Sequence, residues 1–357
     1  MTTSARTRLA VLLGGDSSEH TISVRSARAV LGAVDRDRYE VLPFGITRAG
    51  ALMRPAETEA ALLAIDDGAP EEIVGAEGRG LLARPQALEA LSTTDVVFPL
   101  VHGRGGEDGA IQGLLELAGL PYVGTGVAGS ALGMDKELSK SLLARTGIPV
   151  APYQLVTYEA WQEDAKGLTR AISELRYPLF AKPANGGSSV GISRVATRED
   201  LAAAVAEALR FDRKVLVEQG IDGREIECAV LGNSDPQASP LGEIRYTREF
   251  YDYEAKYEDT TTQLIAPVEL PAEQTARIQA MAVAAFKALD CAGMARVDFF
   301  LEAGGDVWLN EINTIPGFTD VSMFPRLWQV AGVSFPKLID SLIELAFERH
   351  EERDRVA

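Results

Sequence analysis

Short apolar runs alternate with helical patterns through the first third of this chain, and this alternation restricts the fold more than any other feature. Each apolar run has the length of a strand and ends in a polar or glycine-rich turn. This order is typical of a doubly wound parallel sheet, because parallel strands need a crossover between them. Residues 48–92 show no such pattern, and no element is predicted there. Strands are expected at Leu9 to Leu13, Tyr39 to Ile46 and Asp95 to Val101, and helices at Thr21 to Val34 and Ala110 to Ala118.

Two further units are expected after the first. With 357 residues, the chain is too long for one small domain. We predict an α/β domain over residues 1–132, a small central domain over 133–222 and a C-terminal α+β domain over 223–357. In the central domain, helices are expected at Lys136 to Thr146 and Arg198 to Arg210, and strands at Pro178 to Lys182 and Lys214 to Gln219. In the C-terminal domain, strands are expected at Glu225 to Leu231 and Leu241 to Arg245, a hairpin at Ala295 to Leu301 with Val307 to Ile312, and helices at Ala272 to Leu289 and Pro336 to Glu348.

Charge and composition exclude several classes of protein. The formal net charge is −17, from 52 acidic and 35 basic residues, and a field of this sign repels nucleic acids and anionic lipids. No apolar run reaches the roughly 18 residues of a membrane helix. We therefore expect no nucleic-acid partner and no membrane. Cys228 and Cys291 are too few for a disulfide framework, which favours a cytoplasmic location.

Lysines are scarce in this chain, with 8 Lys against 27 Arg. Lys182 ends a predicted strand, and the Gly- and Ser-rich loop from Ala184 to Gly191 follows it. Backbone amides of such a loop can surround phosphates while a lysine neutralises their charge. The spacing is not that of a Walker motif, so the segment predicts a different phosphate loop or, alternatively, a flexible surface hairpin.

Polar side chains share one face of the predicted hairpin. Arg296 and Asp298 are two residues apart on one strand, as are Glu311 and Asn313 on the other, so each pair points to one side. If the strands pair in register, two carboxylates and an amide oxygen converge, a set that suits Mg²⁺ held partly by nucleotide phosphates. Arg296 would then stabilise developing negative charge. An exposed hairpin with solvated charges would show the same alternation.

Other segments give weaker signals. The turn at Gly14 and Gly15 does not meet the dinucleotide-binding spacing, so no such site is expected. Glu19 begins the next helix, where its carboxylate would either cap backbone amides or accept a ligand's ammonium. After the hairpin, the Gly317 amide can approach an oxyanion and Ser322 can meet a carboxylate.

The segment from Phe250 to Gln263 is a polar, aromatic-rich loop without periodicity. It is long enough to suggest a function, and loops of this kind often close over sites. Lys256 and Tyr257 stand next to each other on it, although this pair could also be ordinary surface.

Taken in order, these motifs resemble those of the D-alanine–D-alanine ligases, members of the ATP-grasp superfamily. The likeness spans nearly the whole chain. The pieces that carry it are Leu12-Leu13-Gly14-Gly15, Ser17, Glu19, His102 to Gly109, Met134-Asp135-Lys136, Lys182 to Asn185, Gly187 to Gly191, Tyr251 to Tyr257 and Glu311 to Thr319.

The resemblance implies a three-domain ATP-grasp fold that grips ATP between its central and C-terminal domains. It also implies a reaction that joins two D-alanines for the peptidoglycan precursor of the cell wall. In that reaction ATP phosphorylates the carboxylate of the first D-alanine, and the amine of the second attacks the acyl phosphate. Two Mg²⁺ ions, with Mn²⁺ able to substitute, and a homodimer are implied as well.

The resemblance assigns roles to three groups of matching residues. Within them Glu19 takes the ammonium of the first D-alanine, Ser322 takes the carboxylate of the second, and Glu19, Ser188 and Tyr257 form a hydrogen-bonded group. The nucleotide-binding group is Lys136, Lys182, Gly187, Ser188, Ser189, Glu218, Gln219, Ile221, Glu225 and Lys256. The metal-binding group is Asp298, Glu311 and Asn313. The substrate and catalytic group is Glu19, His102, Ser188, Lys256, Tyr257, Arg296, Gly317 and Ser322.

Two alternative functions are weighed against this one. A ligase of the same fold could join D-alanine to D-serine or D-lactate; Tyr257 argues against D-lactate, because D-lactate ligases replace this loop. A non-catalytic nucleotide-binding regulatory protein would not need Arg296. Asp320 stands near the second-substrate site where a small residue is frequent, which bears on substrate preference.

Overall fold

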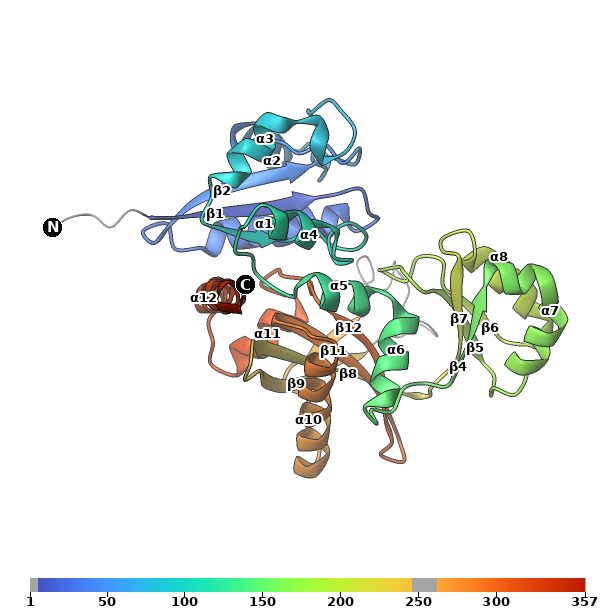
Figure 1. Ribbon diagram of the computed structural model, residues 1–357. Helices are drawn as coiled ribbons and strands as arrows, with labels where there is room; N and C mark the ends of the chain where they lie inside the picture. Colours follow the sequence, from blue (N-terminus) through green and yellow to red (C-terminus); the bar gives the residue numbers. More distant parts are fainter. Residues whose placement is uncertain (1–5, 246–261, 357) are drawn as a thin grey trace.

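The computed structural model describes residues 6–245 and 262–356. It contains three separate sheets, each with its own helices (Figure 1). The first sheet is parallel, with strand order β2-β1-β3. Its strands are β1 (Thr7–Gly14), β2 (Tyr39–Ile46) and β3 (Val96–Pro99), and its helices are α1 (His20–Ala33), α2 (Pro55–Asp66), α3 (Pro85–Ser92) and α4 (Ala110–Leu117).

The second sheet is antiparallel and belongs to the small unit at the right of Figure 1, with strand order β4-β7-β5-β6. Apolar side chains of these strands and of α8 form one closed core, so the unit buries its own hydrophobic face. Its strands are β4 (Tyr153–Thr157), β5 (Leu179–Pro183), β6 (Ser193–Val195) and β7 (Lys214–Gln219). Its helices are α7 (Tyr158–Ile172) and α8 (Leu201–Ala208).

The third sheet is also antiparallel, with order β10-β9-β8-β11-β12. Its strands are β8 (Gly223–Gly232), β9 (Gln237–Arg245), β10 (Gln263–Ile265), β11 (Gly293–Glu302) and β12 (Val307–Asn313). The helices α10 (Ala272–Ala288), α11 (Met323–Val330) and α12 (Phe335–Val356) pack on it. The helices α5 (Val127–Met134) and α6 (Lys136–Arg145) connect the first unit to the second, and Leu143 of α6 packs in the core of the third sheet.

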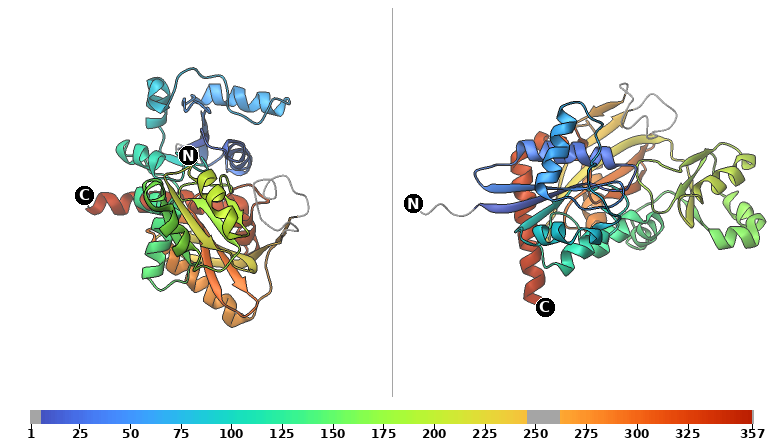
Figure 2. Two further views of the ribbon diagram at one scale, coloured as in Figure 1. Left: turned by 90° about the vertical axis from the view of Figure 1, so that its right-hand side faces the viewer. Right: turned by 90° about the horizontal axis from the view of Figure 1, so that it is seen from above.

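The first and third units share one core. Val11 of β1, Phe98 of β3, Phe318 and Leu338 belong to a single cluster of buried side chains. Phe98 and Phe318 pack edge to face, with ring centroids 5.4 Å apart. The views in Figure 2 show α12, in red, running beneath the first sheet, whereas the central unit stands apart. The first and third units are therefore joined by a continuous hydrophobic core, and the central unit has its own.

The three-part α/β and α+β architecture is confirmed, and the observed strands match most of the predicted runs. The helices α5, α7 and α11 and the strands β4, β6 and β10 had no counterpart among the predicted elements. In the segment from 48 to 92, the structure places α2, a short 3₁₀ turn (Leu81–Ala83) and α3. Among the described residues, no helix is long and apolar enough to cross a bilayer.

Candidate active site

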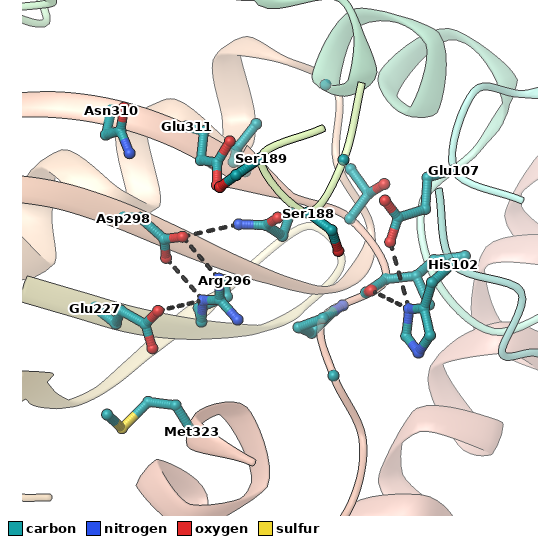
Figure 3. A pocket seen from close by; sticks show the side chains of 18 of the residues that line it. His102, Glu107, Ser188, Ser189, Glu227, Arg296, Asp298, Asn310, Glu311 and Met323 are labelled. Carbon is teal, nitrogen blue, oxygen red and sulfur yellow. Dashed lines mark hydrogen bonds and ion pairs between the residues drawn. The ribbon is translucent and has the colours of Figure 1, made fainter. Parts of the chain in front are cut away.

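One cleft lies where the three units meet, and most of the residues singled out from the sequence line it (Figure 3). The first unit contributes Glu19 and His102, and the second contributes the loop around Ser188. The third unit contributes Arg296 and Asp298 from β11 and Glu311 from β12. Side chains far apart in the sequence thus face one space.

The predicted register of the hairpin is confirmed. Arg296 lies opposite Asn313, and Asp298 lies opposite Glu311. On the other side of β11, Glu227 of β8 lies opposite Asp298. Three carboxylates therefore form a row across β8, β11 and β12. The side chains are largely buried, so the alternative of a solvated surface hairpin is wrong.

A β-bulge at Asn310 makes this row possible. Asp298 pairs with Glu311 but Phe299 pairs with Leu309, so Asn310 is the extra residue on β12. On a regular strand Leu309 and Glu311 would point to the same side. The extra residue lets Leu309 stay in the hydrophobic core while Glu311 lines the cleft, and bulges often re-aim side chains at sites in this way.

Arg296 is the cationic centre of the row. Its Nε and Nη2 each donate a 2.8 Å hydrogen bond to Asp298, and Nε also lies 3.0 Å from Glu227 Oε1. Burial alone would lower the pKa of Arg296, but Asp298 and Glu227 outweigh it and hold the pKa well above its usual value. A permanent, oriented positive charge therefore faces the cleft.

Glu19 connects the first unit to the loop of the second. It occupies the N-cap position of α1 but makes no capping hydrogen bond, so the capping alternative is wrong. Instead Ser188 Oγ donates a 2.5 Å hydrogen bond to Glu19 Oε1. The contact joins residues 169 positions apart and closes the cleft on this side.

The loop that contains Ser188 has a strained backbone. Ser188 and Ser189 both have positive φ, 47° and 59°. Such backbone costs about 1–3 kcal/mol per non-glycine residue and is concentrated at functional sites. Successive amides in and next to this conformation form concave anion sites, which agrees with the predicted phosphate loop.

Two lysines lie beside this loop. Lys136 Nζ donates a 2.7 Å hydrogen bond to Gly186 O and lies 3.9 Å from Glu311 Oε2. Lys182 Nζ donates a 2.7 Å hydrogen bond to Glu218 Oε2. Both line the cleft together with Glu225. Glu218 and Gln219 end β7 and are buried, and neither they nor Ile221, which follows them, belongs to the set of cleft-lining residues.

His102 joins the first unit to the loop after the hairpin. Its Nδ1 lies 3.0 Å from Ile315 O and its Nε2 3.0 Å from Ser26 Oγ. Burial alone would lower the pKa of His102, but Glu107 and Glu19 outweigh it and raise the pKa. Ser26 Oγ also accepts a hydrogen bond from Phe318 N.

The turn that follows β12 brings Gly317 and Ser322 together at the rim of the cleft. Ser322 Oγ accepts a hydrogen bond from Thr319 N at 3.1 Å and lies 2.7 Å from Thr319 Oγ1. A Cβ added to Gly317 would lie 3.2 Å from Ser322 Oγ, so the two residues are close. Lys256 and Tyr257, and the loop closure expected of their segment, lie outside the described residues.

Sequence reasoning missed three charged residues of this region. Glu227 contacts Arg296, Glu107 lies 3.6 Å from His102 Nδ1, and Lys140 is buried beside Glu218. The sequence does contain a signal for Glu227 and one for Lys140. Glu227 alternates with Ile226 and Cys228 on its strand, and Lys140 follows Lys136 by one helical turn in a chain with few lysines.

The predicted metal ligands face one another, but they supply only part of a coordination sphere. No cluster of three or more His, Cys, Asp or Glu side chains with metal-binding geometry occurs in the described ranges. Asn313 Nδ2 donates to Asp298 Oδ2 at 2.9 Å, which orients the amide with its oxygen as the remaining ligand atom. Two carboxylates and an amide oxygen fit Mg²⁺ whose other ligands are phosphate oxygens and water.

Family models match both parts of the chain. The model for the D-ala D-ala ligase N-terminus matches residues 8–125, and the model for the D-ala D-ala ligase C-terminus matches residues 142–344. The chain belongs to the D-alanine–D-alanine ligase family. Among relatives in this family, the D-alanine–D-alanine ligase of Geobacillus thermodenitrificans is 47% identical, with 98% of each chain covered. D-alanine–D-alanine ligase A of Salmonella typhimurium is also 47% identical, with 97% of each chain covered.

Solved structures of the family have the same fold. The D-alanine–D-alanine ligase of Coxiella burnetii has a TM-score of 0.82 and 38% identity, over 99% of this chain and 97% of that one. The D-alanine–D-alanine ligase of Bacillus anthracis complexed with ATP has a TM-score of 0.77 and 27% identity, over 97% and 99%. The D-Ala:D-Ser ligase VanG of Enterococcus faecalis has a TM-score of 0.81 and 34% identity, over 96% and 100%.

Proposed function

We propose that this protein uses ATP to join two D-alanines into D-alanyl-D-alanine for cell-wall synthesis. The observation that carries the proposal is the cleft itself: a carboxylate from the first unit, a phosphate-type loop from the second, and an arginine with an acidic row from the third face one space. The 47% identical relatives named D-alanine–D-alanine ligases support it.

The reaction needs activation, because a carboxylate is a poor electrophile. Phosphorylation by ATP converts the carboxylate of the first D-alanine into an acyl phosphate with a good leaving group. The amine of the second D-alanine then attacks the carbonyl, phosphate leaves, and ADP is the other product. The binding of both substrates in one cleft makes this attack effectively unimolecular.

Each wall of the cleft has a part in this scheme. Lys136, Lys182 and the amides of the loop from Gly187 to Ser189 hold the phosphates, and Glu218, Gln219, Ile221 and Glu225 surround the adenosine. Glu19 accepts the ammonium of the first D-alanine, and His102 positions that substrate through its contact with the turn after β12. Ser322 takes the carboxylate of the second D-alanine. For Lys256 and Tyr257, which lie outside the described residues, the family resemblance predicts a phosphate contact and a place in the Glu19–Ser188 group.

Arg296 and the Gly317 amide stabilise the negative charge that develops on the carbonyl oxygen. They are held in place before reaction, so little reorganisation is needed when the charge appears. Asp298, Glu311 and Asn313 would hold two Mg²⁺, or Mn²⁺ in their place, and these ions would neutralise phosphate charge.

A second candidate function is D-alanine–D-serine ligation, suggested by the likeness to VanG, but the relatives at 47% identity support D-alanine–D-alanine ligation. The two are separated by an assay of ADP release with Mg²⁺. We expect turnover with D-alanine alone and no faster turnover when D-serine or D-lactate is added. Failure to turn over D-alanine alone would refute the proposal, and ATP binding without any turnover would indicate a regulatory protein.

The homodimer and the cytoplasmic location implied by the family stay predictions. Light scattering of the purified protein tests the first, and fractionation of the producing cell tests the second.

A further inference from the structure

A fully buried lysine lies next to the proposed nucleotide site without a part in the mechanism. Lys140, on α6, is 2% exposed. Its Nζ lies 3.3 Å from Glu218 Oε1, and within the described ranges it makes no hydrogen bond of good geometry. Burial of an ammonium group is costly unless the charge is paired and hydrogen-bonded.

Glu218 is shared between this lysine and a second one. Lys182 Nζ donates a 2.7 Å hydrogen bond to Oε2, the other oxygen of the same carboxylate. The two lysines differ in exposure: the side chain of Lys182 is 13% exposed and lines the cleft, whereas that of Lys140 is 2% exposed. One carboxylate therefore lies between an ammonium in the core and an ammonium at the cleft.

This arrangement matters when a nucleotide enters. The ammonium of Lys182 has three N–H groups, and Glu218 holds one of them, so this carboxylate competes with phosphate oxygens for the charge of Lys182. A buried carboxylate needs a counter-charge, so with Lys182 as its sole partner Glu218 would neutralise most of the charge that the phosphates need. Burial alone would raise the pKa of Glu218, but Lys140 and Lys182 outweigh it and lower the pKa, so the group is a carboxylate anion in need of a counter-charge.

We propose that Lys140 is a positioning residue for ATP: it keeps the charge of Glu218 compensated, so that the charge and the other N–H groups of Lys182 are available to the phosphates. The inference rests on the proposed function, in which Lys182 binds the nucleotide. Lys140 would then affect the affinity for ATP through Glu218 and Lys182, and it would not affect the binding of D-alanine.

The test compares Lys140→Met, Lys140→Arg and the double variant Lys140→Met with Glu218→Gln. Lys140→Met should raise the KM for ATP about tenfold and leave the KM for D-alanine within about twofold. Lys140→Arg, which retains the charge, should stay near the wild type. The double variant is compared with Glu218→Gln alone, which carries the same change beside the adenosine. Once the buried anion is gone, Lys140→Met should change the KM for ATP by less than about twofold. Exposed Lys287→Met is the control for loss of one positive charge.

If Lys140 only fills space in the core, the KM for ATP of Lys140→Arg and Lys140→Met should rank in the opposite order. The larger arginine would then be worse than methionine, and the effects in the double variant would add; either result overturns the proposal. If Lys140→Met does not fold, the wild type with a non-hydrolysable ATP analogue and Mg²⁺ decides the question in a crystal structure. Lys182 should then contact phosphate while Lys140 stays on Glu218; a Lys182 that contacts Glu218 but no phosphate oxygen, or a Lys140 that has left Glu218, would refute the proposal. Failure of the proposed function can be told apart from failure of this inference, because the wild type would then release no ADP with D-alanine.

Discussion

At Gly187 the phosphate-type loop passes so close to Glu19 that an added methyl group would not fit, and an alanine there tests whether this approach governs substrate binding. A Cβ at Gly187 would lie 2.3 Å from Glu19 Oε2, whereas ordinary contact begins at 3.4 Å. The loop or the carboxylate must therefore move by about 1 Å, a displacement that can cost about 100-fold in rate when it disturbs a reacting geometry.

The carboxylate has little room to yield. Ser188 Oγ holds one of its oxygens, and a Cβ at Gly103 would lie 2.7 Å from the other, so Glu19 is confined between two glycines. We expect Gly187→Ala to lower kcat/KM for D-alanine about 100-fold in the ADP-release assay. The melting temperature should change little, because Gly187 lines the cleft and belongs to none of the hydrophobic cores of the described residues.

Gly186→Ala is the matched control. It lies in the same loop, and its added Cβ would find its nearest neighbours at 3.8 and 3.9 Å, which is ordinary contact. Both substitutions restrict the unfolded chain equally. The control should keep kcat/KM within about threefold of the wild type. Equal kcat/KM for the two folded variants would refute the reasoning from the Glu19 contact.

Three more predictions follow from the site and the core. Arg296→Ala should reduce kcat about 100-fold or more while ATP affinity, measured by calorimetry, stays within about threefold; a parallel loss of both would show that Arg296 binds nucleotide instead. Glu311→Gln should raise the Mg²⁺ concentration for half-maximal ADP release about tenfold or more, and an unchanged Mg²⁺ titration would remove Glu311 from the metal group. Burial raises the pKa of the Cys228 and Cys291 thiols to about 12. At pH 8, well below that pKa, both stay protonated, so iodoacetamide should modify neither in the native protein and both after unfolding, as mass spectrometry would show; rapid native alkylation would contradict the buried placement.

The hairpin of the third unit could be predicted from the sequence because its information is local. Arg296, Asp298, Glu311 and Asn313 follow the two-residue period of a strand, and a short turn fixes which residues face one another. The bulge at Asn310 could not be predicted. It turns Leu309 into the core and Glu311 into the cleft, and the sequence alone does not show that these two side chains must point to opposite sides.

Contacts between distant segments were beyond local reasoning. The sequence alone left Glu19 open between helix capping and ligand binding, since both uses suit a carboxylate at a helix start. Its bond to Ser188 depends on how two units approach each other. Lys140 follows Lys136 by one helical turn, but its contact with Glu218 likewise depends on how α6 meets β7, which the spacing does not show.

The central claim is that the cleft activates a carboxylate by phosphorylation. D-alanine labelled with heavy oxygen in its carboxylate, incubated with ATP, Mg²⁺ and the enzyme, tests this directly through mass analysis of the released phosphate. The account predicts that each peptide bond formed moves one labelled oxygen into inorganic phosphate. Unlabelled phosphate beside labelled AMP, or peptide formation without any transfer of label, would contradict it.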